Sequence, residues 1–202
     1  DGITCSNTRN IIFNENYVAI LIECNKKRFE ELTSNYKNNQ NVHCINEQVG
    51  FNESNLDLLL NKYDLNVPVD FDFLSIDIDG NDYHILDTIE PLNARVLVVE
   101  YNPKFRPPVK WVMDYNPSHS GDGSDYQGAS LKSFEILLSN KGYKLVGCNL
   151  LGINSFFVRE DLMKDNFHDD CSAENHYEPE RFFLNIGLSP LHKANFGPFQ
   201  KK

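Results

Sequence analysis

The sequence predicts an α/β fold in which a doubly wound, mostly parallel sheet ends in an antiparallel hairpin. Short apolar runs alternate with segments whose apolar residues recur at helical spacing, and this alternation is typical of parallel strands joined by helical crossovers. The last two apolar runs, residues 143–149 and 155–159, are separated by too few residues for a crossover. We therefore expect these two runs to pair as a hairpin.

The first third of the chain begins this alternation. Ser6 or Asn7 can cap a short helix around residues 11–13. The next expected elements are strands over residues 17–23 and 42–46 and helices over residues 26–36 and 56–63. Pro68 separates the last of these helices from the strand that follows.

The stretch from residue 70 to residue 83 contains the strongest functional signal. Its apolar residues between 71 and 78 indicate a central strand that is buried on both faces. Asp77, Asp79 and Asp82 surround Gly80 at the end of this strand, and carboxylates so close together repel one another unless something compensates them. Because ligands gather at the carboxyl ends of parallel strands, we expect chemistry here. The alternative is a polar turn in which Asp82 caps the next helix.

The second half of the chain completes the expected domain. It should contain a helix over residues 82–89, a strand over residues 95–100 and a helix from Ser130 to Gly142. Residues 101–130 lack periodicity, and aperiodic loops of this length are commonly lids or binding loops. We therefore predict one α/β domain over residues 1–160 with a lid over residues 101–130. Residues 161–202 would form an extension that wraps the domain or meets a partner chain in a homodimer.

Composition narrows the class of partner. The 202 residues suit one domain, and the net charge of -10 argues against nucleic acid or an anionic membrane as a partner. No apolar run is long enough to span a membrane. Five scattered cysteines do not suggest a disulfide framework, and the first residues do not resemble a signal peptide. We therefore expect a cytoplasmic protein that acts on small molecules.

Four short motifs point to a particular family. They cover residues 77–83, 98–103, 122–130 and 147–159. Together with the expected sheet and its reversed hairpin, these motifs resemble the FkbM-type class I S-adenosylmethionine-dependent methyltransferases over roughly residues 1–160. The resemblance implies a Rossmann-like fold that here lacks its first strand and most of its glycine-rich loop. Only Asp1 and Gly2 match that loop.

The resemblance also implies cofactor contacts. The residues expected to bind S-adenosylmethionine are Asp1, Gly2, Asn7, Glu23, Asn46, Glu47 and Asp77. Glu23 matches the acid that accepts hydrogen bonds from the ribose hydroxyls, a task that suits two carboxylate oxygens. Asn46 and Glu47 lie where the family contacts adenine, and Asp77 would face the cofactor amine and the substrate.

The activity that the resemblance implies is in-line transfer of a methyl group to a small-molecule or sugar hydroxyl. The catalytic candidates are Asp77, Asp79, Asp82 and Glu100. One of these carboxylates could take the hydroxyl proton, and crowding should raise the pKa of at least one of them. Related enzymes hold Mg²⁺ with such acids, which would lower the pKa of the hydroxyl instead. The sequence leaves both routes open and assigns no metal ligands.

Three other functions fit parts of the sequence. Asp77-x-Asp79-Gly80 resembles the nucleophile motif of haloacid-dehalogenase-type phosphatases, although it stands late in the chain. A glycosyltransferase could use the same Asp-x-Asp pair to hold Mn²⁺ and a nucleotide sugar. A relative without an intact cofactor pocket would be a binding protein rather than an enzyme.

The remaining candidate residues carry weaker signals. His84 could be a base or a helix-surface histidine. The lid aromatics Trp111, Tyr115 and Tyr126 could stack on the acceptor or anchor the lid in apolar grooves. The ligand types at residues 168–176 do not have a usual zinc spacing, so we expect no structural zinc there.

Overall fold

The computed structural model describes the chain except residues 5, 16, 52–54, 122, 182–196 and 202. The described residues form two compact units, Asp1–Val67 and Pro68–Lys202. Both are α/β, and their strands form separate sheets. The predicted α/β class is confirmed at this level, whereas the doubly wound arrangement and the domain over residues 1–160 remain predictions.

The first unit follows the predicted order of elements. Its helices are α1 (Arg9–Glu15), α2 (Lys26–Tyr36) and α3 (Leu56–Lys62), and its strands are β1 (Ala19–Ile22) and β2 (Val42–Ile45). The two strands pair in parallel, as a crossover through α2 requires. The side chain of Asn25 caps α2 by accepting a hydrogen bond from the amide of Arg28. Ile12, Leu32 and Tyr36 form the centre of this unit's core.

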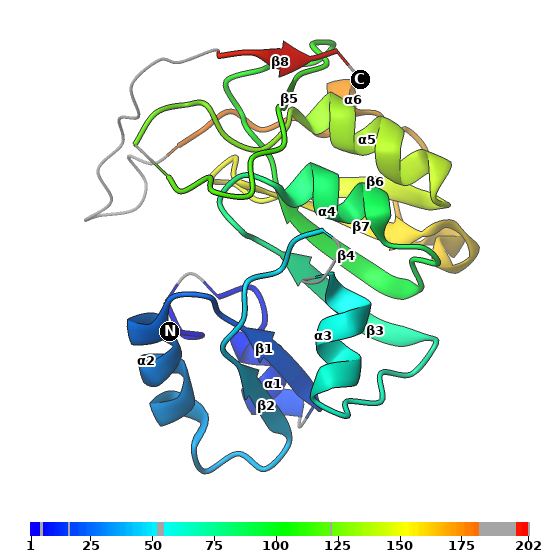
Figure 1. The fold of residues 1–202 in the computed structure, drawn as a ribbon. Helices are drawn as coiled ribbons and strands as arrows, with labels where there is room; N and C mark the ends of the chain where they lie inside the picture. The colour runs from blue at the N-terminus through cyan, green and yellow to red at the C-terminus, as the bar shows by residue number, and fades with distance from the viewer. Residues whose placement is uncertain (5, 16, 52–54, 122, 182–196, 202) are drawn as a thin grey trace. The chain divides into compact units, whose positions relative to one another are not determined.

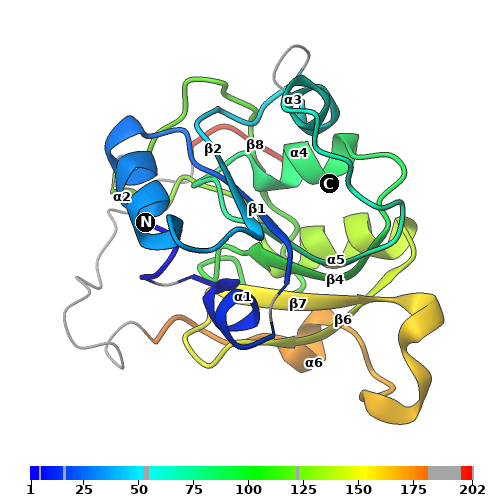
Figure 2. The ribbon, with the colours of Figure 1, turned by 90° about the horizontal axis from the view of Figure 1, so that it is seen from below.

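The second unit contains a four-stranded mixed sheet (Figure 1). Its strands are β3 (Phe71–Ile76), β4 (Ala94–Glu100), β6 (Tyr143–Cys148) and β7 (Asn154–Arg159), in the order β3-β4-β7-β6. β3 and β4 are parallel, and α4 (Asp82–Thr88) lies between them in the chain. β7 runs antiparallel to both of its neighbours, β4 and β6, which lie beside it in Figure 2. The predicted hairpin is therefore confirmed.

Burial in this sheet is greatest on β4. Leu97, Val98 and Val99 are fully buried there. β3 is instead an edge strand of the four-stranded sheet, and Ile76 is its one buried residue. The expectation of a central strand is therefore not met in this sheet, and the expectation of burial on both faces is not met because most residues of β3 are only partly buried.

The predicted lid is a packed segment. Trp111 is buried and stacks on Phe105 with the ring centroids 4.1 Å apart. The next residues form the short strand β5 (Val112–Met113), which pairs with β8 (Phe199–Gln200) at the end of the chain. Of the two roles considered for Trp111, the structure favours anchoring of the lid over stacking on an acceptor.

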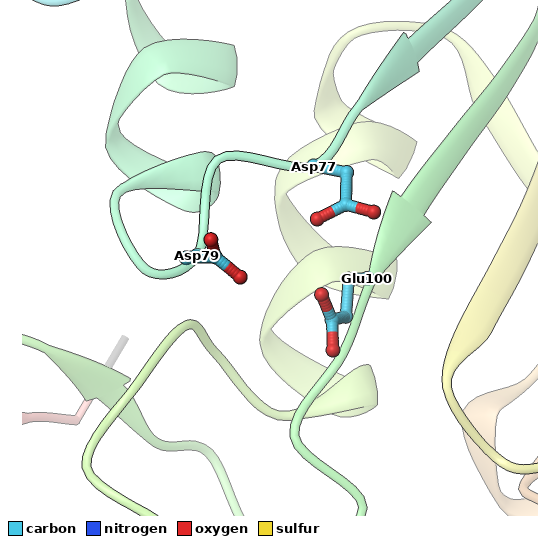
Figure 3. Close-up of side chains that lie close together, drawn as sticks. All are labelled: Asp77, Asp79 and Glu100. Atoms are coloured by element: carbon cyan, nitrogen blue, oxygen red, sulfur yellow. The ribbon is translucent and has the colours of Figure 1, made fainter. Parts of the chain in front are cut away.

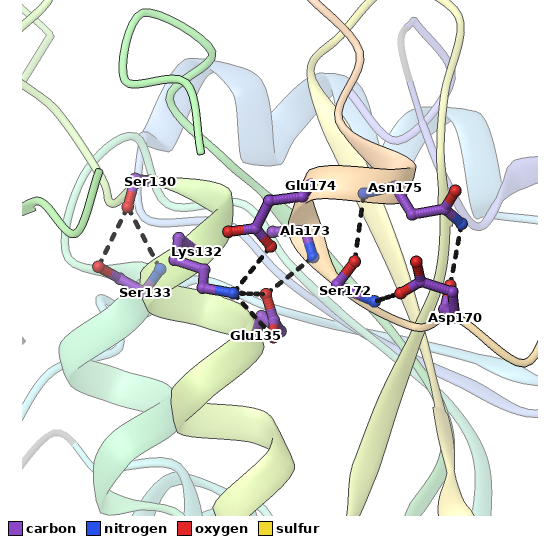
Figure 4. Close-up of polar contacts among 9 residues, drawn as sticks. All are labelled: Ser130, Lys132, Ser133, Glu135, Asp170, Ser172, Ala173, Glu174 and Asn175. Atoms are coloured by element: carbon purple, nitrogen blue, oxygen red, sulfur yellow. Dashed lines mark hydrogen bonds and ion pairs between the residues drawn. The ribbon is translucent and has the colours of Figure 1, made fainter. Parts of the chain in front are cut away.

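The C-terminal extension packs on the second unit. After two 3₁₀ turns, Glu160–Leu162 and Lys164–Asn166, the chain forms the short helix α6 (Ala173–His176) beside α5 (Leu131–Asn140) (Figure 4). Lys132 on α5 pairs with Glu135 and Glu174, and the Glu135 carboxylate accepts a hydrogen bond from the amide of Ala173 at 2.8 Å. These contacts support the expectation that the extension wraps the domain. The apolar residues 182–184 lie outside the described residues.

No helix among the described residues is long and apolar enough to cross a membrane.

The Tyr143 hydroxyl offers a test of this sheet. It is buried and lies 3.1 Å from the carbonyl oxygen of Leu92 and 2.5 Å from that of Ala94. Tyr143→Phe should lower the free energy of unfolding by about 1–2 kcal/mol, because two buried carbonyls lose their donor. Chemical denaturation measures the change. Tyr17→Phe, at an exposed tyrosine, is the control, and equal stability of the two variants would contradict the assignment.

Candidate functional site

The turn between β3 and α4 carries most of the acidic residues. Asp79 adopts a positive φ of 58°, which is a strained conformation for a residue with a side chain. Gly80, the next residue, is packed tightly: a Cβ added there would lie 2.4 Å from the His119 ring. The turn therefore has one strained residue and one position where only glycine fits, and such positions cluster at functional sites.

Asp82 holds this turn in shape. One of its carboxylate oxygens accepts a hydrogen bond from the amide of Ile78 at 3.1 Å, and the other accepts one from the amide of Gly80 at 3.0 Å. The side chain is 2% exposed, and burial raises its pKa to about 6 despite these two bonds. Asp82 was a catalytic candidate from the sequence; its bonds show that it holds the turn, and it does not cap α4, whose N-cap residue is Asn81.

The other three acidic candidates come together at the carboxyl ends of β3 and β4 (Figure 3). Oxygen atoms of Asp77, Asp79 and Glu100 all lie within 4.8 Å of one another. Asp77 and Asp79 are exposed, whereas Glu100, the last residue of β4, is partly buried. We call these three residues the acidic cluster. The sequence predicted this convergence from strand ends alone.

Glu100 has the most perturbed carboxyl group of the cluster. Its pKa is raised well above the usual range, first by desolvation and then by the nearby charges of Asp77 and Asp82. It also shares a hydrogen bond with the Asp77 carboxyl group. The expectation that crowding raises the pKa of at least one carboxyl is therefore met by Glu100.

A pocket of about 240 Å³, which includes open solvent, adjoins the cluster. Its lining residues come from the acidic turn, the end of β4 and the far end of the lid. They are Asp79, Gly80, Asp82, Glu100, Tyr101, Asn102, Gln127 and Gly128. Asp79, Asp82 and Glu100 thus line a hollow that is partly open to solvent.

The lid is attached to this site by side chains. Asn81 and Asn116 exchange hydrogen bonds of 2.8 and 3.2 Å, and His119 lies against Gly80. His84 is 6% exposed and its Nε2 lies 2.7 Å from the carbonyl oxygen of Met113. His84 is therefore neither a surface histidine nor a base with a free Nε2; it binds the lid backbone.

The cofactor candidates other than Asp77 belong to the first unit. Glu23 follows β1, and one of its carboxylate oxygens accepts a hydrogen bond from the amide of Asn25 at 2.7 Å. Asn46 follows β2 and donates to the backbone oxygen of Glu23 at 2.7 Å. The structure thus brings these two candidates together at neighbouring strand ends.

The remaining cofactor candidates make local bonds. Asp1 accepts hydrogen bonds from the amides of Ile3 and Thr4, and the carbonyl of Gly2 accepts one from the Tyr36 hydroxyl. Glu47 pairs with Lys62 and Tyr63, and these bonds lower the pKa of its carboxyl group. Asn7 also has an interaction partner. Both bonds go to Oε1 of Glu47, and its contact with adenine stays a prediction.

The histidines near the C-terminus lie close to one another. His168 and His176 have ring centroids 6.4 Å apart. Within the part of the chain that the structure describes, the acidic cluster is the one group of three or more potential metal ligands whose donor atoms lie within 4.8 Å of one another.

Sequence reasoning missed two residues that shape the pocket. Asn102 donates from its amide nitrogen to the backbone oxygens of Asp125 and Gln127, at 2.7 and 3.0 Å, and so joins the end of β4 to the lid. Gln127 lines the pocket beside it. Both residues lie within the motifs at 98–103 and 122–130, which were the available signal.

Comparisons of this chain with protein-family models, with curated proteins and with solved structures find no significant match.

Close packing at Gly80 predicts a specific sensitivity. Gly80→Ala should lower the free energy of unfolding by about 1–3 kcal/mol, because the added methyl group must displace the His119 ring. Gly121→Ala is the matched control, since a Cβ there meets no atom within 4 Å. Chemical denaturation of both variants measures the difference. If Gly80→Ala were as stable as the control, the packing of the lid on this turn would be wrong.

The raised carboxyl pKa values predict how stability depends on pH. A carboxyl whose pKa is higher in the folded than in the unfolded state stabilises the fold while protonated, and this contribution is lost as pH rises through the folded pKa. Stability should therefore fall as pH rises from about 4, the usual carboxyl range, through the folded pKa of about 6 of Asp82, and should continue to fall through the raised pKa of Glu100. The stability of the Glu100→Gln variant should fall less over this range, because one of the two titrating carboxyl groups has been removed.

Urea denaturation at each pH measures this slope. Glu30→Gln, at an exposed residue of α2, is the control and should follow the unmodified protein. A Glu100→Gln variant with an unchanged slope would contradict the buried, proton-binding state of Glu100.

Proposed function

We propose that this protein is an S-adenosylmethionine-dependent O-methyltransferase that acts on a small-molecule hydroxyl. The observation that carries the proposal is the convergence of Asp77, Asp79 and Glu100 at the carboxyl ends of two neighbouring parallel strands, beside a pocket. The reversed hairpin of β6 and β7 also fits the family that the sequence resembles. Ligand sites of α/β sheets lie at this end of the strands.

The reaction needs alignment and a base. The hydroxyl oxygen forms a bond to the methyl carbon while the carbon–sulfur bond breaks and its electron pair goes to sulfur, so the sulfonium becomes a neutral thioether. The hydroxyl proton must go to a base. Glu100 suits that role because its raised pKa makes it a better proton acceptor than an ordinary carboxylate, and because it lines the pocket.

The donor set of the acidic cluster suits a hard divalent cation. Mg²⁺ prefers carboxylate oxygens, and Asp77, Asp79 and Glu100 supply three such groups. Bound there, the cation would lower the pKa of an acceptor hydroxyl and offset the repulsion among the carboxylates. Glu100 must release its proton to act as a ligand, so cation binding should strengthen as pH rises.

Glu23 of the first unit is a candidate for binding a nucleoside. Glu23 has one carboxylate oxygen bound to the amide of Asn25, while its other oxygen makes no hydrogen bond to any described residue. That second oxygen can accept a hydrogen bond from a ribose hydroxyl. Glu23 therefore fits the proposed cofactor, with one oxygen rather than two.

Phosphoryl or glycosyl transfer is the second candidate, because an Asp-x-Asp pair beside a cation site also serves those reactions. Against it, the residues that line the pocket include three acids and no Lys or Arg to receive a phosphate group. The third candidate is a protein that binds a ligand without catalysing a reaction.

Calorimetry with S-adenosylhomocysteine tests cofactor binding. We expect saturable binding that Glu23→Gln weakens about tenfold, because a charged acceptor of ribose hydroxyls is lost. Glu30→Gln is the control. Absence of binding, with and without Mg²⁺, would contradict the proposal, and Mg²⁺-dependent hydrolysis of p-nitrophenyl phosphate would support the phosphatase instead.

Transfer of a labelled methyl group from S-adenosylmethionine to a panel of hydroxyl compounds tests the base. Glu100→Gln should reduce kcat by about 10²-fold or more and leave the affinity for S-adenosylhomocysteine nearly unchanged, because it removes the proton acceptor and not the nucleoside contacts. An equal loss in the Glu30→Gln control, or no loss in Glu100→Gln, would remove Glu100 from this role.

A further inference from the structure

Most polar side chains around the pocket are already occupied. Both carboxylate oxygens of Asp82 bind backbone amides of the turn, and the Tyr101 hydroxyl donates to the carbonyl of Glu178 at 2.6 Å. The amide nitrogen of Asn102 donates twice to the lid backbone, while its amide oxygen accepts a hydrogen bond from the amide of Lys104. The atoms of Asp82, Tyr101 and Asn102 that make these hydrogen bonds are not available to bind a substrate.

Three polar side chains of the pocket lining remain, and they are Asp79, Glu100 and Gln127. The first two belong to the acidic cluster. The side-chain amide of Gln127 makes no hydrogen bond to any residue that the structure describes. Gln127 is therefore the neutral polar group of the lining that is free to bind a ligand.

The backbone around Gln127 is held firmly. Its amide donates to the carbonyl of Asp125 at 3.0 Å, and its carbonyl accepts from the Asn102 side chain at 3.0 Å. Asn102 follows Glu100 by two residues, so the same side chain links the lid to the strand end that carries the proposed base. The backbone of Gln127 is thus held by two hydrogen bonds, while its side chain makes none to a described residue. This combination is expected of a residue that recognises a substrate.

The charge of the pocket limits what Gln127 can recognise. The lining contains Asp79, Asp82 and Glu100 and no cationic side chain, so a phosphorylated or carboxylated acceptor would be repelled. A primary amide donates and accepts at once, which matches a hydroxyl that both accepts and donates.

We infer that Gln127 is the specificity-determining residue for the acceptor, and that the acceptor is an uncharged compound with adjacent hydroxyls. Gln127 binds one hydroxyl while its neighbour lies at the acidic cluster. This inference rests on the proposed function for what happens to the second hydroxyl, but the binding itself does not require the cofactor.

Ligand-observed NMR with three neutral diols, catechol, cis-1,2-cyclohexanediol and methyl β-D-glucopyranoside, tests the inference. The anionic counterpart is methyl β-D-glucopyranosiduronate, and all are measured without Mg²⁺, because a bound cation would offset the repulsion on which the comparison depends. At least one diol should bind, and the anionic sugar should bind more weakly than the neutral glucoside. Gln127→Ala should weaken diol binding about tenfold, Gln127→Asn should restore part of it, and Gln127→Glu should not.

Gln40→Ala makes the same change at an exposed glutamine of the first unit and should leave diol binding unaltered. Failure of all three diols to bind, equal binding of the anionic sugar and the neutral glucoside, or full binding by Gln127→Ala would each overturn the inference. Binding of S-adenosylhomocysteine is measured on the same samples. If the diols bind through Gln127 while S-adenosylhomocysteine does not bind, the proposed function fails and this inference stands.

Discussion

The candidate site depends on two hydrogen bonds that the Asp82 carboxylate accepts from the amides of Ile78 and Gly80. They hold a turn in which Asp79 is strained and Gly80 is closely packed against the lid. Without them, mutual repulsion would separate the carboxylates that the turn and β4 bring within 4.8 Å. One buried acid thus positions the turn that carries Asp77 and Asp79, and burial together with the charges of its neighbours raises the pKa of Glu100.

The lid and the C-terminal extension act as one support for the pocket wall. The side chains of Asn81, His84 and Asn102 form hydrogen bonds to the backbone of the lid. All three residues lie within a few positions of the acidic cluster in the sequence. The extension adds the β5–β8 pairing, an ion pair between Lys104 and Glu180, and a hydrogen bond from Tyr177 to the carbonyl of Pro103. The pocket is thus formed by residues far apart in sequence.

Periodicity was sufficient to predict the helices α1 to α5, the order of β1 to β4 along the chain and the hairpin of β6 and β7, because these depend on local spacing of apolar residues. It failed for β3, whose apolar side chains suggested a central strand, because sheet position depends on long-range pairing. The acidic cluster was predictable since parallel strands end at one edge. The lid contact of His84 and the place of Gln127 beside the end of β4 were not, because each depends on hydrogen bonds between distant segments. The hydrogen bonds of Asp82 are local, but they depend on a turn geometry that apolar spacing does not specify.

The most direct test of the central claim, that the crowded carboxylates form a cation-binding catalytic site, is the number of protons released when Mg²⁺ binds. Calorimetric titration at about pH 6 in two buffers of different ionisation enthalpy measures this number. The account predicts binding with release of up to about one proton, and loss of that release in Glu100→Gln. Absence of Mg²⁺ binding, or binding with the same proton release in Glu100→Gln, would contradict it.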